Sequence, residues 1–437
     1  MAPTWFLEPS EECPKGFRAF ADRFSLRAGG ALCQQDTVVR WVQSRPVGGR
    51  FGPEDRSFAG LLRSLERRLM DVVALELDAS SGAILRLVRP RRTFEQHCET
   101  LVWMVEDRVL SALQAMARVS PAALDRFVQP RLSPRRRRQA RVLARGTSVF
   151  RGLAVGALGR EILVLAGQDV ARECAGVLLT GPGPAEEWLH RRKIPSMIAS
   201  PPASREGLVT LEGDRLYDGA LPVWHIQFLP PGMERLLEWA DQVAAARVLA
   251  EVTSPAEAEL GLDLGARGGF VRLKRLLAGK RPTRAALHHT LEPLVASFGN
   301  RRLVIRLLEP AGLYALQLDV LAGLASQLTK PRILALMSHP EPGVWKRQGV
   351  RLGQAVEAVR DLSPGRYLAL DLEQMELQPT TSLQLDRVVL GLLGEDPQRA
   401  LLADRLGARF ITCRPLEVPG LRLRLGQAWL ERHLKPP

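Results

Sequence analysis

Apolar residues first recur at helical spacing beyond an irregular start. Residues 1–56 are rich in Gly, Pro and Arg and show no clear period. The pattern then predicts a helix over residues 58–77, with four leucines on one face. Those leucines are Leu61, Leu62, Leu65 and Leu69. A strand over residues 83–88 and a helical pattern over residues 94–117 follow.

A stretch punctuated by proline separates this part from the next. Pro121, Pro130 and Pro134 interrupt the pattern, and four consecutive arginines, Arg135–Arg138, follow directly. We interpret the stretch as a linker and the arginines as a solvated face. Between residues 146 and 222, short apolar runs alternate with Gly and Pro turns, which indicates a compact α/β module.

From residue 233 onward, helical patterns alternate with nearly continuous apolar runs. Seven runs have the pattern of buried strands, and they begin at Arg247, Gly268, Arg302, Arg332, Arg366, Val388 and Ala408. Repeated strand–helix units with such strands favour a parallel sheet. Seven of them favour a (β/α) barrel over an open sheet.

The composition is strongly basic, and most of the basic residues are arginines. Of the 61 Lys and Arg residues, 7 are Lys, which leaves 54 Arg, and the formal net charge is +14. Usage rich in Arg and poor in Lys and Asn is typical of a GC-rich, bacterial-type genome. A generally basic surface therefore explains the excess more simply than a dedicated polyanion site. The apolar fraction of 46% indicates globular cores, and no apolar run is long enough for a transmembrane helix.

The start of the chain and its cysteines favour a cytoplasmic protein. No basic start precedes an apolar stretch, so we expect no signal peptide. The five cysteines form no CxxC pair and have no histidine at zinc-ligand spacing. They are Cys13, Cys33, Cys98, Cys174 and Cys413. Free thiols in a reducing compartment fit best.

Several motifs follow one another along the chain in a fixed order. The closing stretch GARFITCRPLEVPGLRLRLGQAWL is the most specific, and WAD, VIRLLEP and DLEQM precede it. ARGTSVFRGLAVG and LERRLMDVVALEL lie further upstream. Together they resemble the pyruvate, phosphate dikinases, which utilise phosphoenolpyruvate. In that family the closing stretch and the three short motifs before it belong to the barrel. ARGTSVFRGLAVG resembles the entrance of a swivelling phosphohistidine domain, and LERRLMDVVALEL resembles the tail of an ATP-grasp domain.

The resemblance implies an α/β protein of several parts. Residues 1–93 resemble a remnant of the C-terminal part of an ATP-grasp domain, and residues 94–145 a helical linker region. Residues 146–225 resemble the phosphohistidine-like mobile domain. Residues 233–437 resemble an incomplete TIM-type (β/α) barrel that binds phosphoenolpyruvate or pyruvate.

The family's phosphoryl carrier and ATP ligands have no match here. Its phosphohistidine position falls on Pro184 or Ala185, and we expect His190, the nearest histidine, to face solvent. The Glu and Gln that serve ATP and its metal align with Val73 and Val88. The resemblance therefore implies neither a phosphohistidine nor an ATP site.

The anion site of the family's barrel is partly retained. Arg306, Arg351 and Arg272 align with arginines that hold phosphoenolpyruvate. Asp371 aligns with the metal-binding Asp, although a single carboxylate holds magnesium poorly and the alternative role is to cap the next helix. Leu393 stands where the family has its proton-donating Cys, and leucine cannot transfer a proton.

These matches predict a shortened, non-catalytic relative that serves as a binding, scaffold or regulatory module. We expect no cofactor. The expected partners are a small anion such as phosphoenolpyruvate or pyruvate, another protein, or a second copy bound through the barrel. The alternative is a phosphotransferase with an altered site, which would use Mg²⁺. Polyanion binding through Arg135–Arg138 is a third reading, but without an aromatic platform we expect neither nucleic acid nor membrane as a partner.

Overall fold

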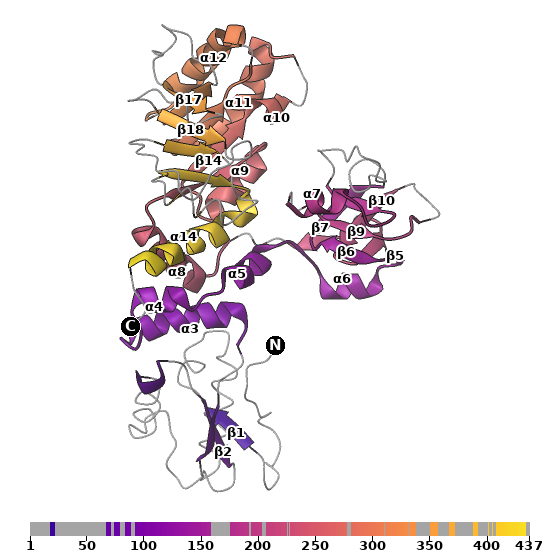
Figure 1. The fold of residues 1–437 in the computed structure, drawn as a ribbon, viewed down its shortest axis with the longest axis vertical. Helices are drawn as coiled ribbons and strands as arrows, with labels where there is room; N and C mark the ends of the chain where they lie inside the picture. Colours follow the sequence, from indigo (N-terminus) through magenta and orange to yellow (C-terminus); the bar gives the residue numbers. More distant parts are fainter. Residues whose placement is uncertain are drawn as a thin grey trace. The chain divides into compact units, whose positions relative to one another are not determined.

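The computed structural model describes a subset of the chain, which divides into two compact units. The described residues are 18–21, 67–70, 74–78, 84–88, 92–158, 175–191, 194–202, 207–224, 226, 228–277, 281–309, 311–330, 332–337, 350–356, 367–371, 388–391, 401, 404 and 408–433. Unit 1 comprises residues 1–123, 230–243 and 429–437, and unit 2 comprises residues 124–229 and 244–428. Figure 1 gives the labels of the elements.

Unit 1 contains an antiparallel sheet in the order β1-β2-β3. Its strands are β1 (Arg18–Ala21), β2 (Ala74–Asp78) and β3 (Ile84–Val88). The helix predicted over residues 58–77 is therefore wrong at its end, because residues 74–77 belong to β2. Pairing with β1 and β3 supplies hydrogen bonds that a local helical pattern does not reveal. The predicted strand over residues 83–88 is confirmed.

Three helices pack together in unit 1. They are α3 (Phe94–Glu106), α4 (Ala112–Ala117) and α8 (Pro231–Val243). Thr93 and Ser111 begin α3 and α4 with capping boxes, in which each hydroxyl accepts from a backbone N–H three residues on. Gly232 lets α8 approach α3 closely, since a Cβ there would lie 2.8 Å from backbone atoms of Glu99. These helices confirm the pattern predicted over residues 94–117.

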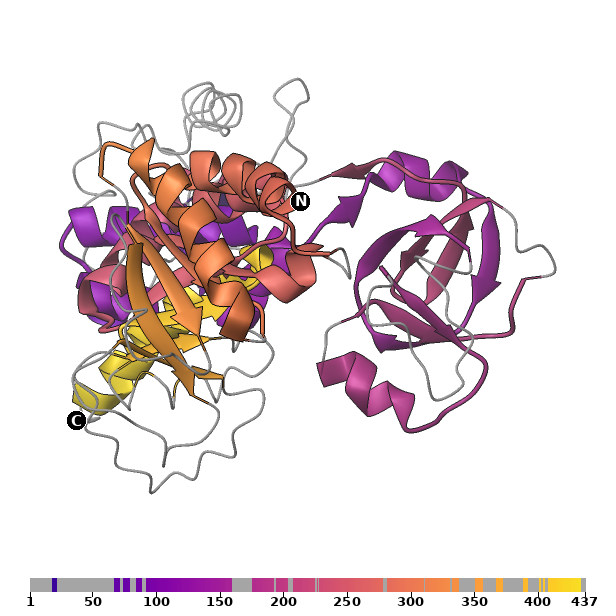
Figure 2. The same ribbon diagram turned by 90° about the horizontal axis from the view of Figure 1, so that it is seen from above.

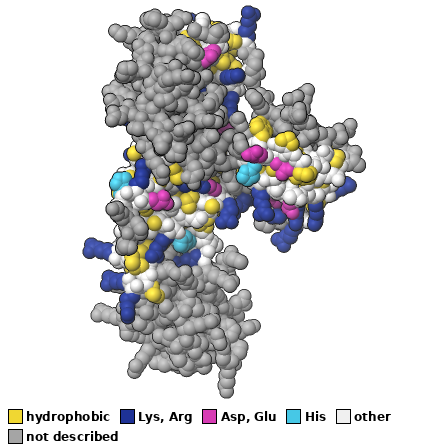
Figure 3. All heavy atoms as spheres, viewed as in Figure 1, with side chains coloured by type: hydrophobic (Ala, Val, Ile, Leu, Met, Phe, Trp, Pro, Cys, Tyr) yellow, Lys and Arg dark blue, Asp and Glu magenta, His cyan; other side chains and the backbone are white. Residues whose placement is uncertain are grey.

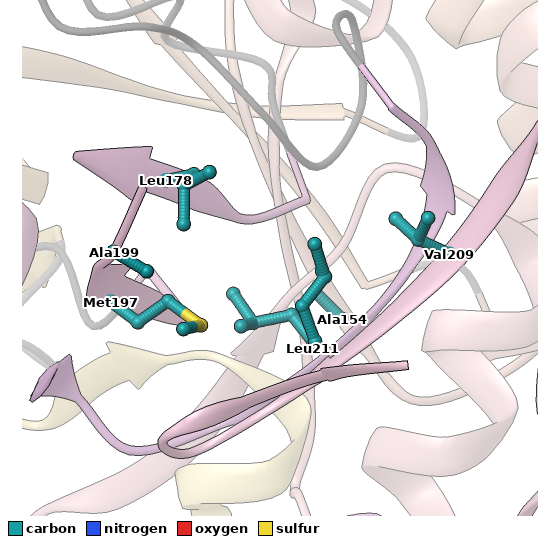
Figure 4. Close-up of a cluster of buried hydrophobic side chains, with 7 residues drawn as sticks. Ala154, Leu178, Met197, Ala199, Val209 and Leu211 are labelled. Carbon is teal, nitrogen blue, oxygen red and sulfur yellow. The ribbon is translucent and has the colours of Figure 1, made fainter. Parts of the chain in front are cut away.

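The first part of unit 2 holds two small sheets that share one core. One is antiparallel, in the order β5-β11-β10-β7, and the other has the order β6-β9-β8. Six of the buried side chains between them are labelled in Figure 4. The strands are β5 (Val142–Arg145), β6 (Thr147–Phe150), β7 (Leu153–Ala157), β8 (Val177–Leu179), β9 (Ser196–Ile198), β10 (Leu208–Glu212) and β11 (Arg215–Asp218). The compact α/β module expected after residue 146 is therefore present.

Three helices and a two-stranded ladder complete this part. The helices are α5 (Pro121–Val128), α6 (Pro134–Gln139) and α7 (Ala185–Arg191), and the ladder pairs β4 (Arg131–Leu132) with β12 (Val223–Trp224). The arginine run Arg135–Arg138 forms most of α6. Its side chains are exposed, as expected of a solvated face, and Arg137 joins α6 to the neighbouring sheet.

The second part of unit 2 is a parallel (β/α) assembly. Its strands pair in the order β13-β14-β15-β16-β17-β18-β19-β20, and β20 also pairs with β13, so the pairings close on themselves. The strands are β13 (Arg247–Glu251), β14 (Gly268–Arg272), β15 (Arg302–Arg306), β16 (Ile333–Met337), β17 (Val350–Val356), β18 (Tyr367–Asp371), β19 (Val388–Gly391) and β20 (Phe410–Cys413). The expectation of an incomplete barrel missed β17, whose glycine and polar residues hide its strand pattern.

Helices cover the outside of these strands, as the orange helices beside the orange strands in Figure 2 show. They are α9 (Pro255–Asp263), α10 (Leu273–Leu277), α11 (Arg284–Phe298), α12 (Tyr314–Ser326) and α14 (Val418–His433). The inner core is formed by one residue or two from each of several strands: Leu249, Phe270, Val304, Leu334 and Leu336, with Phe410 packed against them. Layers of inward side chains of this kind fill a (β/α) barrel.

Gly420, in the first turn of α14, permits an ion pair between α14 and α5. Arg424 donates to both carboxylate oxygens of Asp125, and a Cβ at residue 420 would lie 1.8 Å from Asp125 Oδ1. We expect Gly420→Ala to lower the free energy of unfolding by at most about 1 kcal/mol, because it displaces this part-exposed ion pair. Gly323→Ala is the control: it lies in α12 with nothing within 4 Å of the added Cβ. It should stabilise the protein by about 0.5–1 kcal/mol. Equal effects in urea denaturation would contradict this account.

Candidate functional site: an arginine cluster at the carboxyl ends of the barrel strands

Three charged side chains extend the inward face of the barrel at the carboxyl ends of neighbouring strands. Glu251, Arg272 and Arg306 are the last residues of β13, β14 and β15, respectively. Each lies two residues beyond a member of the inner core, and side chains two apart share a face. Barrel enzymes build their sites at this end of the strands.

Glu251 binds two arginines at once. Its Oε1 lies 3.2 Å from Nε of Arg272 and 2.8 Å from Nη1 of Arg275 in α10. The Glu251 side chain is 6% exposed and that of Arg272 is 12% exposed. A carboxylate this deeply buried is stable only when paired. The cluster is therefore a built arrangement of charge rather than a set of solvated side chains.

Arg306 lies beside Arg272, and the loop that follows Arg306 is held by a buried glutamine. The register of β14 and β15 sets it directly against Arg272. The chain after β15 is held by Gln317 of α12, which is fully buried. Its amide accepts from the Leu308 N–H at 2.7 Å and donates to the Leu308 carbonyl at 3.1 Å. This clamp fixes the loop that begins directly after Arg306.

The four side chains carry an excess of positive charge. Arg272, Arg275 and Arg306 contribute three positive charges against the single negative charge of Glu251. Guanidinium groups present rigid forks of donors that match carboxylate and phosphate oxygens. The arrangement is therefore suited to a small anion rather than to a cation.

The remaining residues predicted for the barrel site divide between two ends of the strands. Asp371 is the last residue of β18, paired with Gly391, so its backbone lies at a carboxyl end. Arg351 is the second residue of β17 and pairs with Leu334, whereas Arg306 is level with Leu336. The backbone of Arg351 thus lies two residues nearer the amino ends than that of Arg306. The register of β17 against β16 causes the difference. Leu393 lies outside the described residues.

The described residues do not fit a magnesium site. Among them, no group of three or more His, Cys, Asp or Glu side chains is placed to hold a metal ion. The buried carboxylate at this end of the barrel, Glu251, is already shared by two arginines. Magnesium prefers several oxygen ligands that are not neutralised in this way.

In the first part of unit 2, the residues at the expected phosphohistidine position lie at the start of α7. Pro184 is exposed and precedes the helix, and Ala185 is its first residue. His190 is exposed near the end of α7, and its ring meets Phe150 edge-on with centroids 5.8 Å apart. In unit 1, Val88 ends β3, and Val73 lies outside the described residues.

Cys98 and Cys413 are buried and form no disulfide, and the other three cysteines lie outside the described residues. Burial, with smaller effects of Glu99 and Glu95, raises the pKa of Cys98 from 9.0 to about 12. A pKa raised in the folded state stabilises the protein below the unfolded pKa and loses that effect as pH rises. We expect the free energy of unfolding of the wild type to fall between pH 9 and about 12. The free energy of unfolding of Cys98→Ser, measured by urea denaturation, should fall less over this pH range. Identical pH profiles of the wild type and the variant would contradict the prediction.

Comparison with known proteins gives one informative match. No model of a known protein family matches the chain. Pyruvate, phosphate dikinase of Rhizobium meliloti (strain 1021) is 22% identical over 262 residues, which cover 50% of this chain and 29% of that protein. The relationship is distant. The match extends over less than a third of the dikinase.

Two solved structures give weaker similarities. The tryptophan synthase alpha chain of Legionella pneumophila subsp. pneumophila has a TM-score of 0.30 at 12% identity, covering 46% of this chain and 98% of that one. Tryptophan synthase of M. tuberculosis has a TM-score of 0.29 at 10% identity, covering 45% and 97%, respectively. These scores are too low to establish a common fold.

Among the described residues, none of the helices is long and apolar enough to span a membrane.

Proposed function

We propose that the barrel is a non-catalytic binding module, descended from the phosphoenolpyruvate/pyruvate barrel of the dikinases, that holds a small carboxylate or phosphate anion. The observation that carries the proposal is the charge cluster at the carboxyl ends of β13, β14 and β15. There Arg306 lies beside an arginine pair that shares one buried carboxylate. Phosphoenolpyruvate and pyruvate are the natural probes, because the distant relative is a pyruvate, phosphate dikinase.

The other parts of the chain extend the same proposal. Residues 146–225 are proposed to derive from the phosphohistidine domain and residues 1–93 from the end of an ATP-grasp domain. The order of the motifs supports both assignments. We also propose that the protein is cytoplasmic and that another protein or a second copy of the chain binds to the barrel.

The ligand should bind without magnesium. Arg272, Arg275 and Arg306 already supply positive charge at the site. Glu251, a buried carboxylate at this end of the barrel, is already neutralised by two of them, so it offers little attraction to a metal ion.

The alternative is a working phosphotransferase with an altered site. The match to a dikinase favours it, but it requires a phosphorylatable histidine. His190, exposed on α7, is the nearest residue of that type to the expected position.

A labelling experiment separates the two functions. We expect no acid-labile phosphate on the full-length protein after incubation with labelled phosphoenolpyruvate or ATP, because Pro184 or Ala185 stands at the carrier position. His190→Ala should not change this result. Label that appears on the wild type and is lost in His190→Ala would establish the phosphotransferase instead.

A further inference from the structure

The four-stranded sheet of unit 2 has an outer face to which α6 is fixed. Nε of Arg137 lies 3.1 Å from Oε2 of Glu212 in β10 and donates to the Tyr217 hydroxyl of β11 at 3.3 Å. These contacts leave Arg135, Arg136 and Arg138 as exposed side chains on a helix that is itself held in place. The fold therefore holds the exposed arginines of α6 in a fixed place on this sheet.

Strand pairing adds two more arginines to this outer face. Glu212 is opposite Arg215 in the β10–β11 ladder, and Arg215 is opposite Arg145 in the β11–β5 ladder. Residues directly opposite in an antiparallel ladder share a face. The other face carries the core residues Leu211 and Leu216. We name Arg135, Arg136, Arg138, Arg145 and Arg215 the basic face.

Charge on this part of the chain is segregated beyond what a basic composition gives. Residues 126–160 contain ten Arg and neither Asp nor Glu, although the whole chain has 47 acidic residues in 437. A genomic bias toward Arg would not remove the acidic residues. Lys and Arg side chains gather along the edge of this module where α6 lies (Figure 3).

The fold keeps a like-charge pair at this face. Arg145 and Arg215 are direct cross-strand neighbours, an arrangement that destabilises a ladder. Asp214 lies 3.8 Å from Arg215 and Glu212 3.1 Å from Arg137, and Glu212 is also the cross-strand neighbour of Arg215, so these carboxylates offset part of the repulsion. A bound polyanion would relieve the remaining repulsion.

The side chains around the basic face discriminate among polyanions. Protein interfaces usually include an exposed apolar anchor. Within the described part of unit 2, the large exposed hydrophobics are Leu208, at the far end of β10 from Glu212, and Phe228, outside this sheet. Single-stranded nucleic acid is usually held by stacking on exposed aromatic rings, and Tyr217 is fully buried. Arginines alone suffice for contacts to the phosphates of a duplex.

We infer that the basic face binds the phosphate backbone of double-stranded nucleic acid without reading its bases. Arginine forks on α6, β5 and β11 contact phosphate oxygens, and binding releases counterions from the duplex. The activity is independent of the anion site in the barrel.

Two full-length triple variants with equal loss of charge test this inference. One combines Arg135→Ser, Arg136→Ser and Arg138→Ser, and keeps Arg137, which fixes α6. The control combines Arg281→Ser, Arg301→Ser and Arg332→Ser, all exposed in the barrel part of unit 2. Binding of a short mixed-sequence duplex DNA is measured by fluorescence anisotropy over a range of salt concentrations. The slope of log K against log salt should fall by about 2–3 in the first variant, at about 0.9 per phosphate contact, and by under about 1 in the control.

Other results overturn the inference. Equal weakening in both variants would mean that net charge alone attracts the duplex. If the wild type does not bind the duplex at low salt, the basic face has no such binding activity. Tighter binding of a single strand, of poly-glutamate or of anionic lipid vesicles through the same three arginines would assign the face to that partner instead. Circular dichroism of both variants checks that the folds are equal.

Discussion

Replacing Glu251 with alanine is expected to lower the free energy of unfolding by about 3–5 kcal/mol, the range for a broken buried ion pair. The carboxylate is shared by Arg272 and Arg275, and the Arg272 guanidinium is nearly buried. Removing it leaves positive charge close to the adjacent Arg306 without the group that neutralises it. Urea denaturation of the full-length protein measures the change.

Two further substitutions sharpen this test. Glu259→Ala removes an exposed carboxylate from α9 and should change the free energy of unfolding by at most about 0.5 kcal/mol. Glu251→Gln keeps the volume and the hydrogen-bonding oxygen but loses the charge, so its effect should fall between the other two. If Glu251→Ala behaves like Glu259→Ala, the cluster does not hold the barrel strands together.

Replacing Arg306 with alanine is expected to weaken anion binding by about 1.5–3 kcal/mol, the range for a charged hydrogen bond. This corresponds to a loss of affinity of roughly tenfold to more than a hundredfold. The reason is geometric, because Arg306 ends β15 beside Arg272, and Gln317 fixes the loop that follows it. Its effect on folding should be smaller than that of truncating a core residue.

Matched variants distinguish a binding role from a general effect of charge. Arg301→Ala removes an exposed arginine just before β15 and should leave anion affinity unchanged. Arg306→Lys keeps the charge but loses the planar fork, so it should recover only part of the affinity. Equal affinities of the wild type and Arg306→Ala would place the anion elsewhere.

The sequence predicted most of the barrel because its strands are nearly continuous apolar runs. The segments at Arg247, Gly268 and Arg302 became β13, β14 and β15. β17 escaped prediction because Gly353 and Gln354 interrupt its apolar pattern, and pairing with β16 and β18 stabilises it instead. Residues 74–77 were assigned to a helix for the same reason, since tertiary pairing overrides a local period.

The candidate site was predicted in part. Motifs led to Arg306 and Arg272, but Glu251 and Arg275 were missed because a shared ion pair is a tertiary feature. A usable signal existed, since an acidic residue at the end of the apolar run RVLAE, on a strand buried on both faces, requires a cation nearby. The level of Arg351 in the barrel depends on strand register, which motif spacing does not reveal.

Calorimetric titration of the full-length protein with phosphoenolpyruvate, with and without magnesium, tests the central claim most directly. We predict saturable binding at or below millimolar concentration that does not require magnesium, and no binding of ATP in parallel titrations. Binding of phosphoenolpyruvate only with magnesium, or no binding at millimolar concentration, would contradict the assignment of the arginine cluster as an anion site.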